Sequence, residues 1–160
     1  MRALPNSLSY RRSRFGTNLP VDRLYTADHY WLLQDEPGLW RVGLTAFGTR
    51  QRGDLVECAF AVAPGVPVSL GQEIGSIEGL KALTSICSVV EGEFLGGGDD
   101  VLSDSTIVEM DPYDQGWLYR VRGRPDPAAV DVHRYVSILD AAIDQWLRGQ
   151  RDSSGRGHEG

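Results

Sequence analysis

The sequence predicts a mainly β protein with one helix near its C-terminus. Three observations indicate this fold class: short runs rich in Val, Ile, Trp and Tyr, turns with Gly or Pro between those runs, and one amphipathic stripe late in the chain. Short strands broken by frequent turns are typical of a small barrel or sandwich. The length of 160 residues fits one domain with tails.

Six runs have the length and composition of β-strands, and each is bounded by a turn signal. They are residues 30–34, 40–45, 55–62, 72–79, 84–90 and 117–122. Residues 46–52 predict one helical turn between two of these strands. Gly96, Gly97 and Gly98 predict a flexible turn. No Lys-Ser or Lys-Thr pair follows them, so they do not form a phosphate-binding loop.

Residues 126–149 predict the C-terminal helix. Asp126 can cap its N-terminus, and Pro127 suits its first position. Gly149 can end it. Apolar residues recur every three or four positions and form one stripe, namely Val132, Val136, Leu139, Ile143, Trp146 and Leu147. We expect this stripe to cover an open face of the β core.

The chain is expected to divide into four parts. Residues 1–20 predict an irregular, Arg-rich arm, and residues 150–160 predict a disordered tail. Between them lie a β domain, 21–125, and the packing helix, 126–149. The acid-free composition of the arm also resembles a mitochondrial transit peptide, but we favour an arm that is disordered or lies on the surface.

Charge and hydropathy exclude two classes of partner. The net charge is −6, but residues 1–21 contain four arginines and no acid, so residues 22–160 hold 12 basic and 22 acidic residues, a net charge of −10. Phosphates repel such a surface, which argues against nucleic-acid binding. No apolar run approaches the roughly 20 residues that a membrane span needs.

The cysteines and histidines predict no disulfide framework and no metal site. Cys58 and Cys87 lie in apolar runs, as expected of core thiols in a reducing compartment. We therefore expect a cytoplasmic protein, with the mitochondrial matrix as the alternative. A redox role for Cys87 is the other interpretation of that residue. His29, His133 and His158 lack the spacing of metal ligands.

Lys81 is the only lysine of the chain, and the other 15 basic residues are arginines. Codon bias can also remove lysine, so the local sequence has to decide its meaning. Lys81 lies between two β-prone runs, and Gly79 permits the positive φ that a tight hairpin demands. We expect Lys81 at an exposed hairpin tip, which gives a tethered group the rigid base and free end it needs.

Several lysine chemistries compete at such a tip. A Schiff-base lysine needs a depressed pKa, which the neighbouring Glu78 and exposure both oppose. A biotin tether usually has methionine on both sides, whereas Leu80 and Ala82 flank Lys81. A lipoyl tether tolerates these neighbours and commonly has an acid three residues before the lysine, as Glu78 is. An ordinary exposed turn lysine remains the alternative.

Six stretches of the sequence match short motifs in a fixed order. Residues 24–31 (LYTADHYW) resemble Y-T-x-x-H-E-W, residues 42–45 (VGLT) resemble V-G-I-T, residues 53–56 (GDLV) resemble G-D-V-V, residues 75–82 (GSIEGLKA) resemble G-x-x-E-S-V-K-A, residues 92–94 (GEF) resemble G-E-V, and residues 111–118 (DPYDQGWL) resemble D-P-Y-G-x-G-W-L. Each stretch is weak alone, but in this order and spacing the six resemble the motifs of the glycine cleavage system H protein family of lipoyl carriers, and together they indicate its fold.

The resemblance implies a lipoyl/biotinyl-type barrel-sandwich hybrid with a short internal helix and a C-terminal helix. It also implies a carrier and not an enzyme, with lipoate covalently attached to Lys81. Glu78 and Gly65 match positions that a lipoate ligase or lipoyl transferase reads, and Gly79, next to Glu78, is expected to contribute to the same recognition. The implied partners are glycine decarboxylase, a folate-dependent aminomethyltransferase and dihydrolipoyl dehydrogenase, between which lipoyl-Lys81 would transfer an aminomethyl group. An acidic surface suits such fast, reversible docking.

The chain departs from the family pattern at four places near the expected arm. Tyr30 replaces the Glu of H-E-W and brings no charge at neutral pH. Ser85 stands where an acid often follows the lysine, Glu109 replaces an Asn, and residues 89–92 lack the family's proline. These departures concern the cargo more than the tether. The alternatives are a lipoate carrier for sulfur metabolism or lipoate relay, a non-lipoylated scaffold with the same fold, and an enzyme that uses Cys87 or Lys81 directly.

Overall fold

The computed structural model of the protein describes residues 6–51 and 53–157. The chain divides into two compact units, Asp22–Val130 and a smaller one formed by Met1–Val21 with Asp131–Gly160. Within the described residues, no helix combines the length and hydropathy of a membrane span. No group of three His, Cys, Asp or Glu side chains in that part of the chain is arranged to hold a metal ion.

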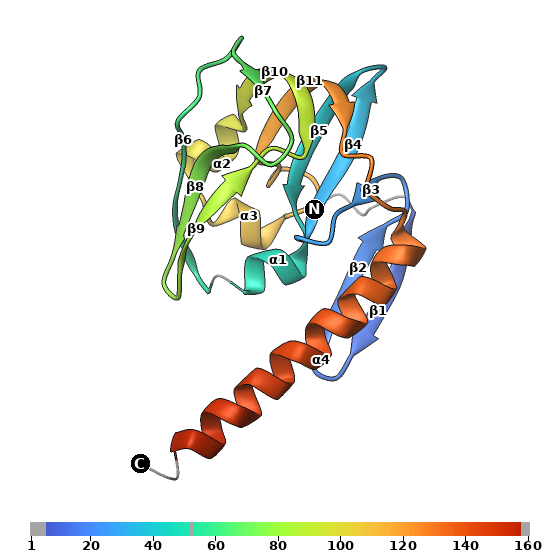
Figure 1. Ribbon diagram of the computed structural model, residues 1–160, viewed down its shortest axis with the longest axis vertical. Coiled ribbons are helices and arrows are strands. Elements are labelled where there is room, and N and C mark those ends of the chain that lie inside the picture. Colours follow the sequence, from blue (N-terminus) through green and yellow to red (C-terminus); the bar gives the residue numbers. More distant parts are fainter. Residues whose placement is uncertain (1–5, 52, 158–160) are drawn as a thin grey trace. The chain divides into compact units, whose positions relative to one another are not determined.

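The larger unit contains two antiparallel sheets (Figure 1). The six-stranded sheet has the order β3 (Leu24–Tyr25), β4 (Tyr30–Glu36), β5 (Leu39–Leu44), β11 (Tyr119–Pro125), β10 (Val90–Gly97) and β7 (Pro67–Val68). The three-stranded sheet has the order β6 (Leu55–Phe60), β8 (Glu73–Gly79) and β9 (Leu83–Cys87). All six predicted strands are present, with shifted ends.

One apolar core joins the two sheets. Leu32, Val42 and Val121 of the larger sheet are fully buried in the same cluster as Ile74 and Ile86 of the smaller one. Alternate residues of β4 and β5 supply this face, as the two-residue period of a strand requires. Burying each Ile or Leu contributes about 1.5–3 kcal/mol, so the core fixes the register that brings the hairpins to the surface.

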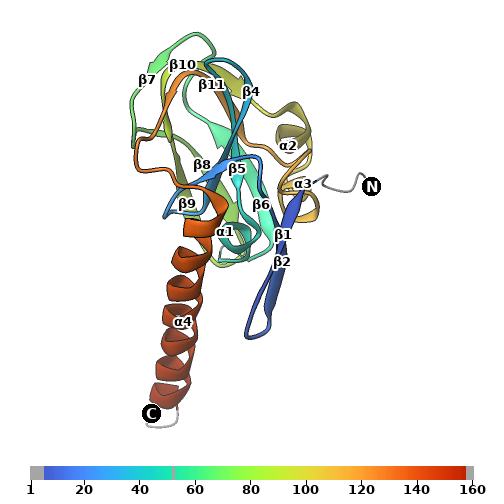
Figure 2. The ribbon, with the colours of Figure 1, turned by 90° about the vertical axis from the view of Figure 1, so that its right-hand side faces the viewer.

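Three short helices belong to the larger unit: α1 (Ala46–Arg50), α2 (Asp99–Ser103) and α3 (Ile107–Met110). The predicted helical turn is α1, and Thr45 caps it by accepting a hydrogen bond from Gly48 N at 3.2 Å. Helices α2 and α3 follow each other on one side of the unit (Figure 2), and α3 contacts α1. Neither α2 nor α3 was predicted.

The glycines predicted to form a flexible turn instead pack tightly. Gly96 and Gly97 lie in β10, and Gly98 directly precedes α2. A Cβ at Gly97 would lie 2.5 Å from the ring of Phe60, and one at Gly98 would lie 2.5 Å from the carbonyl oxygen of Trp117. Gly97 and Gly98 are therefore needed for close approach, and the prediction of a flexible turn over residues 96–98 was wrong.

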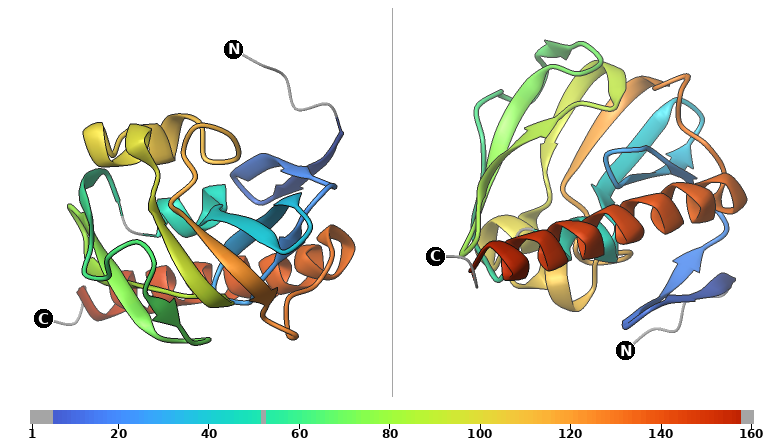
Figure 3. Two further views of the ribbon diagram at one scale, coloured as in Figure 1. Left: turned by 90° about the horizontal axis from the view of Figure 1, so that it is seen from above. Right: turned by 60° about the horizontal axis from the view of Figure 1, so that its bottom comes forward.

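The smaller unit contains a hairpin of β1 (Ser7–Arg12) and β2 (Phe15–Pro20), with α4 (Val132–Gly157) packed against β1 (Figure 3). The prediction of an irregular arm over 1–20 was wrong for residues 7–20. Tyr10 Oη donates to Asp140 Oδ1 at 2.7 Å, and Arg12 donates to both carboxylate oxygens of Asp144 at 2.9 and 2.8 Å. Residues 1–5 of the predicted arm lie outside the described residues.

The ends of α4 differ from those predicted. Asp131 caps the helix by accepting from Arg134 N at 3.0 Å, whereas Asp126 accepts from Ala128 N at 2.9 Å within a turn. At the other end, α4 passes Gly149 and continues to Gly157. One helical glycine costs only about 1 kcal/mol relative to alanine, which does not end a helix by itself. The prediction of a disordered tail over 150–160 was therefore wrong for residues 150–157. Residues 158–160 lie outside the described residues.

The predicted apolar stripe of α4 is present in part. Val132, Leu139 and Ile143 are buried, and Tyr135 is buried with them in place of Val136. The covering of the β core by this stripe stays a prediction.

Candidate functional site

Lys81 lies exposed in the turn between β8 and β9, as the sequence predicted. Gly79 N donates to the carbonyl of Ala82 at 2.8 Å and closes the turn. Leu80 N donates to the carbonyl of Asp54 at 2.9 Å, which ties the turn to the segment before β6. The tip is therefore exposed while its base is held from two sides.

The positive φ predicted for Gly79 is absent, because Gly79 lies in extended β8 and pairs with Leu55. Gly53 has the left-handed backbone beside the lysine instead, with φ +72°. A Cβ built on Gly53 would lie 2.8 Å from Lys81 Cγ and 3.2 Å from Lys81 Cδ. The aliphatic part of Lys81 thus lies directly over the backbone of Gly53. Sequence reasoning missed this contact, although Gly53 opens one of the matched stretches.

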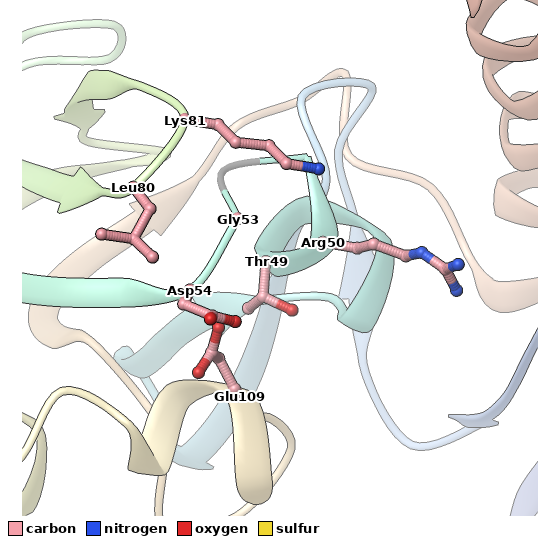
Figure 4. A pocket seen from close by; sticks show the side chains of 7 residues that line it. All are labelled: Thr49, Arg50, Gly53, Asp54, Leu80, Lys81 and Glu109. Carbon is pink, nitrogen blue, oxygen red and sulfur yellow. The ribbon is translucent and has the colours of Figure 1, made fainter.

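Lys81 borders a pocket of about 390 Å³. The pocket is lined by Thr49, Arg50, Gly53, Asp54, Leu80, Lys81 and Glu109 (Figure 4). Glu109, one of the departures from the family pattern, accepts from Leu55 N at 3.2 Å and so holds α3 against the start of β6. Among the described residues, Lys81 forms no ion pair.

An acidic and apolar surface surrounds the turn. Glu78 is exposed and pairs across the sheet with Glu57 on one side and Leu83 on the other. Leu80 and Leu83 are 73% and 72% exposed. Two carboxylates directly opposite each other reduce stability, and exposed leucines contribute nothing to the core. This surface therefore adds nothing to the stability of the fold.

Gly65 is not brought together with Lys81. It lies in a turn with φ +93° and donates through its N–H to the carbonyl of Phe94 at 2.7 Å. Strand β6 starts opposite Gly79 and ends opposite Gly75, so Gly65 follows at the end of the sheet away from the lysine. Its backbone conformation excludes most side chains without strain.

Two of the family departures line a second pocket, of about 360 Å³. Its lining consists of Ala27, Asp28, His29, Tyr30, Gln51, Ser85 and Cys87. Tyr30 is buried, and its hydroxyl accepts from Cys87 N at 3.1 Å. His29 is also buried, with its ring 4.9 Å from that of Phe47, which fits the structural role of this histidine. The family's Glu is absent from this pocket, and Asp28 supplies a carboxylate to it.

Neither cysteine is activated as a nucleophile. Burial, with a smaller effect of the Glu57 carboxylate, raises the pKa of Cys58 to about 12. Burial and the carboxylates of Glu73 and Asp28 also raise the pKa of Cys87. A reactive cysteine needs a lowered pKa, so the alternative of an enzyme that uses Cys87 finds no support.

Comparison with known proteins places this structure in a family. The model of the family described as "Glycine cleavage H-protein" matches residues 23–138. The chain belongs to the glycine cleavage H-protein family. The glycine cleavage system H protein of Sodalis glossinidius is 31% identical over 138 residues, which cover 85% of this chain and 98% of that protein. The H protein of Streptomyces coelicolor is 33% identical over 111 residues, 68% of this chain and 86% of that protein.

A solved structure gives the same result for the fold. The crystal structure of a glycine cleavage system H protein from Mycobacterium marinum superposes with a TM-score of 0.67 at 29% identity, covering 74% of this chain and 97% of that one. This match confirms the predicted barrel-sandwich fold with a C-terminal helix. As a glycine cleavage H protein, the chain is a lipoyl carrier subunit and not an enzyme, and its partners lie within the glycine cleavage system.

Proposed function

We propose that this H protein carries lipoate as an amide on Lys81 and transfers an aminomethyl group between enzymes of the glycine cleavage system. The donor is glycine decarboxylase, the acceptor is the folate-dependent aminomethyltransferase, and dihydrolipoyl dehydrogenase restores the oxidised carrier. The proposal rests on one observation. Lys81, the only lysine of this H-protein chain, is exposed in a turn whose backbone is hydrogen-bonded on both sides. The attached group would supply a redox-active disulfide.

The residues around the turn would present Lys81 to a lipoate ligase or lipoyl transferase. The Glu78 and Glu57 carboxylates offer two charges to basic side chains of that enzyme, and Leu80 offers an apolar contact beside the amine. Gly79 contributes by closing the turn through its N–H. Gly65 acts at a distance, by shaping the turn that precedes β7.

Mass spectrometry after co-expression with lipoate ligase tests the tether. The intact protein gains the mass of one lipoyl group, and the Lys81→Arg variant, which keeps the charge but cannot form the amide, gains none. A wild-type chain that stays unmodified contradicts the proposal.

Glycine–bicarbonate exchange with the decarboxylase tests the cargo, and the expected outcome is exchange that depends on lipoylated Lys81. Tyr30 in place of a carboxylate favours a second candidate, a lipoyl carrier for sulfur metabolism or lipoate relay. A lipoylated protein that is inactive in exchange supports this second candidate.

Since Cys58 and Cys87 are free thiols, we propose that the protein works in the reducing cytoplasm.

A further inference from the structure

We propose that Gly53 is a positioning residue for Lys81. Because Gly53 has no side chain, it leaves a track along which the aliphatic part of Lys81 lies, and this track sets the direction in which the amine leaves the hairpin. The proposal rests on the proposed function, since a direction matters only when an enzyme must find the amine. Its first measurement needs no lipoylation.

The distances define the track. Three carbons of Lys81, Cβ, Cγ and Cδ, would lie 3.3, 2.8 and 3.2 Å from a Cβ at position 53. The shortest of these is closer than two carbon atoms pack, for which about 3.5–4.0 Å is optimal. Figure 4 shows Lys81 running from the hairpin across Gly53 towards the end of α1, with its amine directed away from Asp54 and Glu109. A side chain at 53 therefore has to displace the lysine.

Backbone movement does not relieve this clash easily. Leu80, next to Lys81, is hydrogen-bonded to Asp54, next to Gly53, at 2.9 Å. Leu55 in turn pairs with Gly79 and donates to Glu109. These contacts join the segment of Gly53 to the turn of Lys81, so the two move together. The lysine side chain, which is exposed beyond the track, is the part that gives way.

The φ of +72° at Gly53 offers a competing explanation for a glycine, because alanine is strained in that region wherever it occurs. Gly71 separates the two explanations. It has φ +78°, it is exposed, and a Cβ there would meet no atom within 4 Å. Gly71→Ala therefore introduces the same backbone strain as Gly53→Ala without touching the lysine.

NMR spectroscopy of the unlipoylated full-length protein tests the position of the amine. Reductive ¹³C-methylation labels Lys81 as the only side-chain amine, and the α-amino group gives the second signal. In Gly53→Ala, the Lys81 dimethylamine resonance should shift and narrow because the side chain leaves its track, while Gly71→Ala should keep the wild-type signal. Identical spectra for wild type and Gly53→Ala overturn the proposal.

Lipoyl attachment by lipoate ligase is the second measurement. We expect kcat/KM for Gly53→Ala to fall about tenfold below that of Gly71→Ala, because small misplacement of a reacting group is costly. Equal values for the two variants would reject a positioning role in attachment. If Gly53→Ala does not fold, Gly53→Asn with Gly71→Asn repeats the comparison, since Asn tolerates the left-handed region. A wild type that is not lipoylated contradicts the proposed function but leaves the NMR comparison valid.

Discussion

At the scale of single residues, several side chains around Lys81 lower the stability of the fold or add nothing to it. Glu57 and Glu78 face each other across β6 and β8, and Leu80 and Leu83 expose most of their surface. Natural proteins that break one or two local stability rules tend to do so at functional sites. The carboxylate pair and the leucines are therefore the parts of this surface that we expect a partner to contact.

Neutralising Glu57 should separate stability from recognition. Glu57→Gln removes the repulsion with Glu78 and should raise the free energy of unfolding by about 0.5 kcal/mol, measured by urea denaturation. The same change should slow lipoyl attachment. Glu91→Gln is the matched control, because Glu91 is an exposed glutamate that pairs across the sheet with Arg124. It should lose stability and leave attachment unchanged; faster attachment in Glu57→Gln would contradict the role of the pair.

The buried thiol of Cys58 should make stability depend on pH in the alkaline range. Its pKa rises to about 12 on folding, so the folded state binds more protons than the unfolded state above the pKa of a free thiol. The free energy of unfolding should therefore fall as pH rises from about 9 towards 12, by at most about 1.4 kcal/mol per pH unit from this group. Burial also raises the pKa of Tyr25 and Tyr119, so these tyrosines should likewise lower the free energy of unfolding at higher pH. Urea denaturation at pH 8 and 10 should show a smaller decrease for Cys58→Ala than for wild type.

At the scale of elements, α1 is the part that links the two pockets. Thr49 and Arg50 line the pocket of Lys81, and Gln51, which follows α1, lines the pocket of Tyr30. The loop of the D-P-Y stretch fixes the start of this helix, because Tyr113 Oη accepts from Ala46 N at 3.1 Å. That loop is held in turn by Arg23, which donates to the carbonyl of Tyr113 at 2.8 Å. A short helix is thus placed by tertiary contacts instead of by its own propensity.

Removing the cap of α1 should destabilise the larger unit. Thr45→Ala deletes the hydroxyl that accepts from Gly48 N and should lower the free energy of unfolding by about 1 kcal/mol. Thr45→Ser keeps the hydroxyl and should recover most of this loss. Chemical denaturation followed by tryptophan fluorescence measures both variants, and equal losses would show that the hydrogen bond is not the cause.

The elements that the sequence predicted are those with a local pattern. The six strands have alternating or continuous apolar runs with turn residues at their ends, and these signals need no knowledge of the fold. The hairpin of β1 and β2 was missed because its partners, Asp140 and Asp144, lie about 130 residues away. Strand β10 was missed because Gly97, which was predicted to lie in a turn, serves close packing against Phe60. The contact between Gly53 and Lys81 was also missed, because 28 positions separate the two residues in the sequence.

At the scale of the whole molecule, charge should govern the encounter with partners. The whole chain carries a net charge of −6, so enzymes with basic surfaces should be attracted before contact. Raising the NaCl concentration from about 0.02 to 0.3 M shortens the screening length to several ångströms and should lower kcat/KM for reoxidation by dihydrolipoyl dehydrogenase several-fold. Free dihydrolipoamide, which has no acidic surface, should show little salt dependence. If both substrates showed the same salt dependence, the effect would come from the dehydrogenase and not from the charge of this protein.

The hydrogen bond between Leu80 and Asp54 affects how often a group attached to Lys81 meets the active site of a docked enzyme. A group attached to a freely rotating base would sample a full sphere, and much of that volume would be occupied by its own protein or would point away from any docked enzyme. A base that is tied down confines the reactive end to a smaller solid angle. Effective concentration rises as the accessible volume shrinks. The bond would thus raise the local concentration of cargo at a partner's active site without adding a single contact to that partner.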